Sequence, residues 1–264
     1  MSDTKVIVIT SGKGGVGKTT MTANISTALA KLGKSVLVID ADIGLRNLDM
    51  ILGLENRIVY DVLDAIEQRV SPEKALVKDK RGLPLWLLPA NQTKNKDDID
   101  PVKWNKLIED FKESGKFNYI IIDSPAGIEQ GFKNAVTPAD SAIVVVNPEV
   151  SSVRDADRSI GLMESMGKSD YKIVINRIRW HQVKKGEMLS MEDIVEVLKV
   201  PVLGVVPEEE KLVDFTNRGE PIVLDESYNA SKAIMDIAKR ITGENVPLTL
   251  YDKEKGLLAK LFGR

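Results

Sequence analysis

Short apolar runs alternate with amphipathic stretches along most of the chain. The runs are nearly continuous in Val, Ile and Leu, which is typical of strands buried on both faces. They predict strands at Lys5–Thr10, Ser35–Asp40, Leu85–Leu88, Tyr119–Asp123, Ala142–Asn147, Lys172–Asn176 and Val202–Val206. The stretches between them predict helices at Lys18–Leu32, Asp61–Ile66, Pro101–Lys112, Asp155–Met166 and Met191–Leu198. This alternation indicates an α/β fold with a mostly parallel, twisted sheet and helices on both faces.

The pattern shows no internal repeat, and it predicts a single domain over residues 1–242 followed by a linker at 243–251. The last segment, 252–264, reads DKEKGLLAKLFGR and differs from the rest. Its large apolar residues share one helical face, and basic residues surround them, which is typical of an amphipathic membrane-targeting helix. The residues that we expect to contact the membrane are Leu257, Leu258, Lys260, Leu261 and Phe262. A helix packed on the parent domain is the alternative.

Rough magnitudes suggest how such a tail would act. Burying four large apolar side chains contributes roughly 6–10 kcal/mol. Ordering about ten residues costs on the order of 10 kcal/mol. One tail should therefore bind weakly, whereas two tails joined in a dimer gain through effective concentration. Dimerisation could thus switch attachment to a membrane.

Composition narrows the chemistry. The chain has 264 residues, 37 Lys and Arg against 39 Asp and Glu, no Cys and one His. Near-neutral charge and 5% aromatic residues argue against nucleic acid as a partner. The absence of Cys excludes disulfides and thiolate metal sites. No apolar run approaches the roughly 18 residues of a membrane span, and no signal peptide is evident, so we expect a cytoplasmic protein.

A glycine-rich motif near the N-terminus is the strongest indication of function in the sequence. Residues 12–19, GKGGVGKT, satisfy G-x-x-x-x-G-K-[ST] between a predicted strand and a predicted helix. Glycines let backbone N–H groups face a phosphate, and the helix N-terminus adds positive potential. Lys18 would contact the β- and γ-phosphates, and the Thr19 hydroxyl would bind Mg²⁺. The predicted phosphate loop comprises Gly12, Lys13, Gly14, Gly15, Val16, Gly17, Lys18, Thr19 and Thr20.

Two predicted strands end in aspartate, Asp40 and Asp123. Ligands of parallel sheets bind beyond the carboxyl ends of strands, where a Mg²⁺ partner belongs. The sequence therefore predicts that Asp123 is a carboxylate of the Mg²⁺ site. We also expect the backbone N–H of Gly127 to lie near the γ-phosphate. Of Asp40 and Asp42, one could support the metal or the loop while the other orients the attacking water. The chain lacks an N-K-x-D guanine motif, which favours ATP over GTP.

The second loop lysine, Lys13, makes KGGVGKT resemble the deviant Walker A motif of the MinD/ParA group of P-loop ATPases. DADIGLRNLDMILG, DSPAGIE and NPEVSSVRDADR also resemble this group, and the likeness covers nearly the whole chain. The resemblance implies a P-loop ATPase that uses ATP and Mg²⁺ and forms an ATP-bound homodimer. It also implies attachment to an anionic membrane at the cytoplasmic face, a MinC-like division inhibitor and a MinE-like activator as partners, and a role in septum positioning.

The resemblance also assigns residues. It implies that Lys13 reaches the partner's phosphates, that Asp42 activates water while Asp40 serves the metal, and that Asn47 contacts nucleotide across the dimer. It places four residues around the adenine: Asn176, Arg177, Pro207 and Glu208. It makes Arg154, Asp155 and Asp157 a partner-binding surface; a solvated helix start is the alternative.

Two other functions remain open. A flagellar-number ATPase of the same group shares the site and can share the tail, although Arg46 in GLRNLD and the lack of an N-terminal extension stand against it. A DNA-partitioning ATPase of the ParA type should show a basic surface outside the tail and lack the terminal amphipathic helix.

Overall fold

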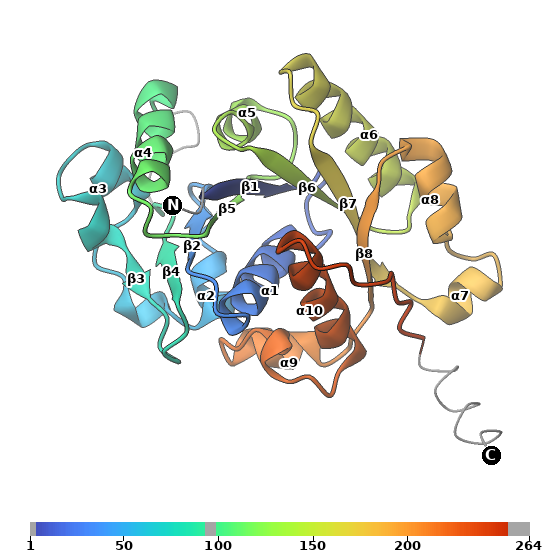
Figure 1. Cartoon of the computed structure of the whole chain (residues 1–264). Coiled ribbons are helices and arrows are strands. Elements are labelled where there is room, and N and C mark those ends of the chain that lie inside the picture. The colour runs from blue at the N-terminus through green and yellow to red at the C-terminus, as the bar shows by residue number, and fades with distance from the viewer. Residues whose placement is uncertain (1–3, 93–98, 253–264) are drawn as a thin grey trace.

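The computed structural model describes residues 4–92 and 99–252 (Figure 1). Within these ranges, eight strands form one sheet in the order β3-β4-β2-β5-β1-β6-β7-β8. All neighbouring strands are parallel except the β3–β4 pair at one edge. The strands are β1 Lys5–Thr10, β2 Val36–Asp40, β3 Val77–Lys78, β4 Leu85–Leu88, β5 Tyr119–Asp123, β6 Ser141–Val146, β7 Tyr171–Ile178 and β8 Val202–Pro207.

Helices cover both faces of the sheet (Figure 1). One layer contains α3 Val62–Ile66, α4 Pro101–Glu113, α5 Gln130–Val136, α6 Val150–Ser165 and α8 Met191–Leu198. The other contains α1 Lys18–Lys31, α2 Leu48–Leu52 and α10 Asn229–Ile241, with α9 Leu212–Asn217 beside them. The short helix α7, Trp180–Lys184, follows β7. The predicted α/β fold with a mostly parallel sheet is therefore confirmed.

The strands separate two apolar cores. In β1, Val6 and Val8 face the core under α4 to α6, whereas Ile7 and Ile9 face the core under α1 and α10. This is why the strand shows a continuous apolar run rather than an alternating one. The chain leaves β1 toward β2 on one side and later adds β6 on the other, so β1 lies at a topological switch point, where ligands of open α/β sheets bind.

Several elements differ from the sequence prediction. The two-residue strand β3 and the helices α2, α5, α7, α9 and α10 were not predicted. Helix α6 begins at Val150, five residues before the predicted start at Asp155. The two polar residues Ser151 and Ser152 gave no apolar pattern from which this start could be predicted. In the structure, however, Ser152 and Val153 are buried and continue the helix face formed by Ala156 and Ile160.

The segment after α10 has no helix or strand up to residue 252, yet it contacts the domain. Arg240 Nε donates to the Val246 carbonyl oxygen at 2.9 Å. The Trp180 indole donates to the Tyr251 carbonyl oxygen at 3.1 Å, and the Tyr251 hydroxyl donates to Asp236 at 2.7 Å. Burial and the Asp236 contact raise the pKa of Tyr251 to about 12. Across the described part of the chain, no helix is long and apolar enough to cross a bilayer.

Candidate active site

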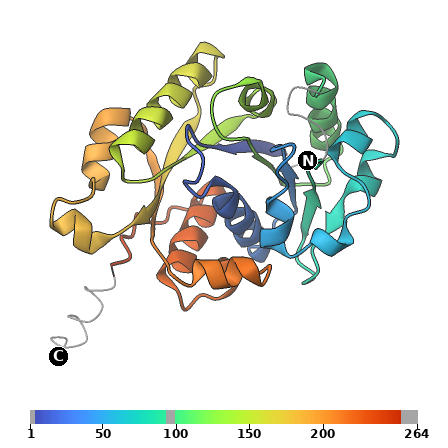
Figure 2. The same ribbon diagram turned by 180° about the vertical axis from the view of Figure 1, so that it is seen from behind.

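The loop between β1 and α1, dark blue in Figure 2, borders a cavity of about 450 Å³. Gly15 and Gly17 have φ angles of 80° and 92°, a region that glycine enters without strain. Helix α1 begins directly after Gly17, so the positive end of the helix meets the loop. This arrangement is typical of a phosphate-binding loop. The expected site residues that line the cavity are Lys13, Gly14, Gly15, Gly17, Lys18, Thr19, Thr20, Asp42, Asn47 and Arg177.

A buried ion pair lies beside this cavity. Lys18 Nζ is 3.1 Å from Asp123 Oδ1, and the two side chains are 6% and 0% exposed. The Thr22 hydroxyl donates to the same oxygen at 2.6 Å, and Lys18 Nζ lies 3.3 Å from the Thr19 hydroxyl oxygen. Asp123 Oδ2 is buried and has no hydrogen-bond partner among the described residues. A buried carboxylate oxygen without a donor, in a cluster where the same ammonium contacts the Thr19 hydroxyl, fits a magnesium ion.

A second buried carboxyl lies on the neighbouring strand, because Asp40 of β2 is opposite Asp123 of β5 in the parallel register. Asp40 accepts hydrogen bonds from the N–H groups of Asp42 at 3.0 Å and Leu48 at 3.4 Å. Burial, together with the nearby charge of Asp123, raises the pKa of Asp40 to about 8. A bound cation would offset both causes, so this pair of carboxyls also fits the metal.

Two loops that follow β2 and β5 approach the cavity. Asp42 and Asn47 line it directly. Gly127 does not, although its neighbour Ala126 does. The Gly127 N–H donates to the Ser11 carbonyl oxygen at 3.4 Å, and the positive φ of 94° explains why glycine is used there.

The residues expected around the adenine meet at a second cavity of about 270 Å³. Asn176 and Arg177 from the end of β7 line it together with Pro207 and Glu208 from the end of β8. Two of them also hold the phosphate loop. Asn176 Nδ2 donates to the Val16 carbonyl oxygen at 2.8 Å, and Arg177 donates to that of Gly15 at 3.1 Å. Since Arg177 lines both cavities, the two are adjacent.

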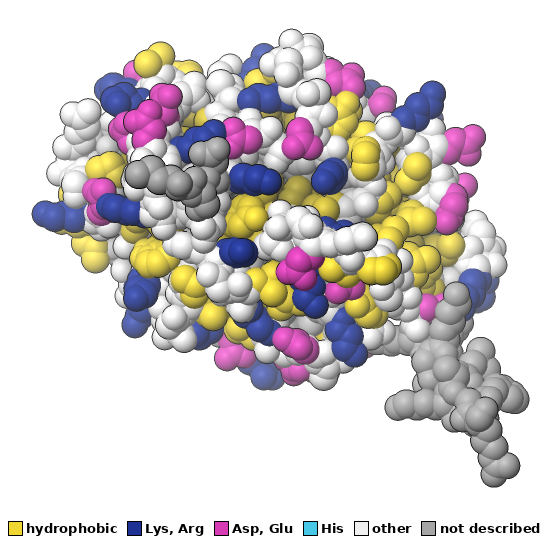
Figure 3. Space-filling model, in the orientation of Figure 1, with side chains coloured by type: hydrophobic (Ala, Val, Ile, Leu, Met, Phe, Trp, Pro, Cys, Tyr) yellow, Lys and Arg dark blue, Asp and Glu magenta, His cyan; other side chains and the backbone are white. Residues whose placement is uncertain are grey.

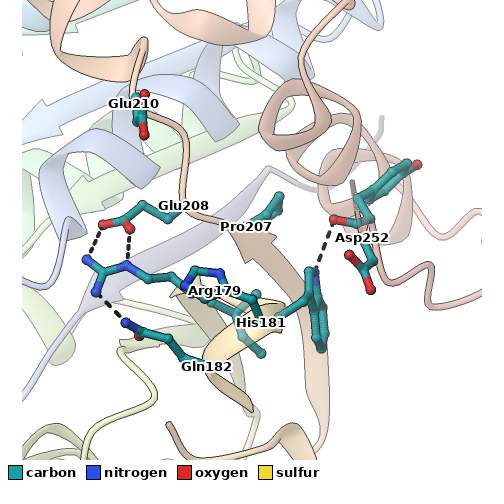
Figure 4. Close-up of a pocket in the computed structure, with 10 residues that line it drawn as sticks. Arg179, His181, Gln182, Pro207, Glu208, Glu210 and Asp252 are labelled. Carbon is teal, nitrogen blue, oxygen red and sulfur yellow. Dashed lines mark hydrogen bonds and ion pairs between the residues drawn. The ribbon is translucent and has the colours of Figure 1, made fainter. Parts of the chain in front are cut away.

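Figure 4 shows a third cavity, of about 490 Å³, on the other side of Pro207 and Glu208. Arg179 lies between Glu208 and Gln182, and its guanidinium donates to both side chains. This contact keeps the pKa of Glu208 below its usual value. His181 lines the same cavity, as do Tyr251 and Asp252 of the C-terminal segment.

Lys13 reaches α6 rather than a carboxylate at the metal site. Its Nζ donates to the Ser151 hydroxyl at 3.2 Å and lies 4.0 Å from Glu149. Gly12 packs against the same helix, and a Cβ at this position would overlap the carbonyl of Asp155. The side chains of Arg154 and Asp157 are exposed on α6, and that of Asp155 is partly exposed. The expected partner surface therefore adjoins the phosphate loop.

The structure adds residues that the sequence reasoning missed. Thr22, which bonds Asp123, lies one helical turn after Lys18, a spacing that could have identified it. Met50 and Thr216 also line the phosphate-loop cavity, but only the fold brings them there. The expected membrane residues, Leu257, Leu258, Lys260, Leu261 and Phe262, lie outside the described residues.

Comparisons with known proteins agree with this geometry. Residues 7–222 match the model of the CobQ/CobB/MinD/ParA nucleotide binding domain. The chain is 51% identical over 260 residues to the septum site-determining protein MinD of Bacillus subtilis (strain 168), covering 97% of this chain and 96% of that protein. It is 46% identical over 268 residues to the MinD protein of Escherichia coli (strain K12), covering 98% and 99%.

Solved structures show the same likeness. One is the MinC:MinD cell division protein complex of Aquifex aeolicus, with 69% identity, a TM-score of 0.89, and coverage of 94% of this chain and 99% of that chain. Another is MinD complexed with Mg-ADP from Pyrococcus horikoshii OT3, with 30% identity, a TM-score of 0.81, and coverage of 97% and 99%. The phosphate loop, the paired carboxyls and these similarities together show that the chain belongs to the CobQ/CobB/MinD/ParA family of nucleotide-binding domains.

Proposed function

We propose that the chain is a Mg²⁺-dependent ATPase whose ATP-bound dimer attaches to the cytoplasmic face of the cell membrane and recruits a division inhibitor that positions the septum. The observation that carries this proposal is the buried Lys18–Asp123 pair, with the unsatisfied Asp123 Oδ2, beside a glycine-lined cavity. The names of the relatives support the cellular role.

Each residue of the site has a role in this proposal. The loop glycines and Lys18 hold the phosphates, and the adjacent smaller cavity holds the adenine. Thr19, Asp40 and Asp123 would hold Mg²⁺, which would neutralise charge on the phosphates. Asp42 lines the cavity and orients the attacking water. Because catalysis here depends on positioning and electrostatics, it needs neither Cys nor His.

Hydrolysis of ATP tests the enzyme directly. The unaltered chain should release phosphate only with Mg²⁺, and Lys18→Ala should abolish release. Lys34→Ala is a matched control, since Lys34 follows α1 and lies outside the cavity. Equal phosphate release by the unaltered chain and Lys18→Ala would contradict the assignment.

The cross-dimer role of Lys13 is tested separately. Its side chain is 44% exposed at the cavity, and its ammonium contacts Ser151 of α6 and Glu149, which directly precedes that helix. Light scattering with ATP should show a dimer of the Asp42→Ala variant, in which hydrolysis is blocked. The same variant carrying Lys13→Ala should stay monomeric. Undiminished dimerisation would overturn this role.

Membrane attachment is proposed through residues 252–264. Sedimentation with phosphatidylglycerol vesicles should show binding with ATP and little binding with ADP. A chain that ends at residue 252 should not bind in either state, and phosphatidylcholine vesicles are the lipid control. Equal binding with ATP and ADP would contradict the switch.

The proposed protein partners are a MinC-like inhibitor and a MinE-like activator at the α6 surface formed by Arg154, Asp155 and Asp157. The solved MinC:MinD complex of Aquifex aeolicus supports the first. Reversing the charge of Arg154 should weaken inhibitor binding while intrinsic hydrolysis is retained.

The DNA-partitioning alternative predicts a basic surface outside the tail. On the face shown in Figure 3, basic and acidic side chains are interspersed, so this face gives that alternative no support. Salt-dependent DNA binding by a chain ending at residue 252 would favour it.

A further inference from the structure

Helix α2 carries part of the wall of the phosphate-loop cavity, although it is only one and a half turns long. Met50 and Ile51 of this helix line the cavity, as does Asn47, which precedes it. A helix this short has no stability of its own, so its position depends on what holds its two ends. Its N-terminal end is attached to the metal-site strand, because the Leu48 N–H donates to Asp40.

The other end of α2 is held by the edge hairpin. Arg81, in the turn between β3 and β4, donates from Nη2 to the Leu52 carbonyl oxygen at 3.1 Å. Leu52 is the last residue of α2, so this bond satisfies a carbonyl that the helix leaves open. Asp79 fixes the guanidinium, since it accepts from Arg81 Nε at 2.9 Å and its side chain is fully buried. The hairpin therefore presents a preorganised donor to α2.

Helix α9 holds the same end from the other side, and both ribbon views show it beside α2 (Figures 1 and 2). Gly53 directly follows α2, and Gly219 lies two residues beyond the end of α9; their φ angles are 66° and 64°. A Cβ at Gly219 would lie 2.5 Å from the Gly53 Cα and 3.2 Å from the Met50 carbonyl oxygen. The two helix ends can therefore meet only because both residues are glycine.

We propose that Arg81 and Gly219 are positioning residues that clamp the C-terminal end of α2, and so hold Asp40 and Asn47 in the geometry that ATP hydrolysis requires. Neither residue lines the cavity. They act through α2, as outer partners do when they orient the groups that hold a metal. The catalytic part of this inference rests on the proposed function, whereas the clamp itself rests on the contacts above.

The first readout is steady-state ATP hydrolysis by the full chain. Arg81→Ala should lower kcat by about ten- to hundredfold and leave KM for ATP within about twofold, because the phosphate loop that binds ATP does not contact Arg81. Arg81→Lys keeps a cation that can reach the Leu52 carbonyl, so kcat should recover in part. Arg57→Ala is the matched control, since Arg57 donates to the Lys78 carbonyl oxygen of the same hairpin and not to α2.

The second readout is amide hydrogen exchange of a peptide covering residues 48–54. Adding Mg²⁺ and ADP should slow exchange there in the unaltered chain and in Arg57→Ala, but not in Arg81→Ala or Gly219→Ala. Exchange in α1 should be the same in all four proteins. Simple loss of stability would instead raise exchange in α1 as well.

The results of these two experiments distinguish failure of the clamp from failure of the proposed ATPase function. The clamp would be overturned if Arg81→Ala had the kcat of the unaltered chain and if Mg²⁺ and ADP slowed exchange at 48–54 in this variant as much as in the unaltered chain. A fall of kcat in Arg57→Ala equal to that in Arg81→Ala would also overturn it. If the unaltered chain hydrolyses no ATP, the proposed function fails, and the exchange experiment still decides the clamp.

Discussion

The ends of β2 and β5 look alike in sequence but differ in chemistry. Each strand is a buried apolar run that ends in aspartate, and the two aspartates are neighbours in the sheet. Asp123 is held by the Lys18 ammonium and the Thr22 hydroxyl. Asp40 is held by backbone N–H groups, and its pKa is raised to about 8.

The difference comes from what α1 supplies. Lys18 and Thr22 are on one face of that helix, and they meet the end of β5 rather than that of β2. One carboxyl is therefore paired with a buried ammonium, whereas the other has backbone N–H groups as its hydrogen-bond donors and a raised pKa. Two strands that end in the same residue type can thus place carboxyls in different surroundings at neighbouring positions of one sheet.

The largest expected effect comes from removing the cation. Lys18→Ala should lower the free energy of unfolding by about 3–5 kcal/mol, because it leaves a buried carboxylate without its ion-pair partner. Urea unfolding in EDTA measures the change. The double variant Lys18→Ala/Asp123→Asn should recover most of the lost free energy of unfolding. If the single and double variants were equally stable, the unpaired Asp123 carboxylate would not be the cause of the loss.

The second effect depends on pH and concerns Asp40. Its pKa is raised on folding, so the folded chain keeps a proton that the unfolded chain loses above about pH 4. Stability from this group is therefore lost as pH rises toward 8. In EDTA the free energy of unfolding should fall by about 2–3 kcal/mol between pH 6 and 8, at about 1.4 kcal/mol per pH unit.

Asp40→Asn should remove that slope and be the more stable protein at pH 8. Asp110→Asn is the control, because Asp110 is an exposed carboxyl on α4 and should leave the slope unchanged. If the free energy of unfolding fell equally with pH in Asp40→Asn and in the unaltered chain, Asp40 would not be the carboxyl that causes the fall. The proposed difference between the ends of β2 and β5 would then be wrong.

The smallest effect tests the Thr22 hydroxyl. Thr22→Val should cost about 1.5–3 kcal/mol, since this hydroxyl bonds a charged group. Thr27→Val on the same helix should cost about 1 kcal/mol, because its equally buried hydroxyl bonds only the Ala23 carbonyl oxygen. Equal losses in thermal unfolding would mean that Asp123 gains nothing special from Thr22.

Much of this arrangement could be predicted from the sequence, for local reasons. The strand β1 has the predicted bounds, and the glycine-rich loop between an apolar strand and a helix is itself a local pattern. The register that brings Asp40 beside Asp123 is not local, and neither is the contact of Arg81 with α2. Both features depend on the order of the strands in the sheet. A short segment of the sequence does not show that order.

The missed elements have separate causes. Helices α2, α7 and α9 have only five or six residues each, too few to show a helical period. Helix α10 is different, because Ala230, Ala233, Ile234, Ile237 and Ala238 form a clear buried face. The spacing of these residues follows the period of a helix, so this element can be predicted from the sequence.

Nucleotide binding in the presence and absence of Mg²⁺ tests the central claim most directly. Calorimetric titration with ADP should show that Mg²⁺ tightens binding to the unaltered chain, because Mg²⁺ is held in such sites by one or two carboxylates together with the phosphates. The enhancement should persist in Asp110→Asn and disappear in Asp123→Asn. The same enhancement in Asp123→Asn as in the unaltered chain would contradict the assignment of this carboxyl to the metal.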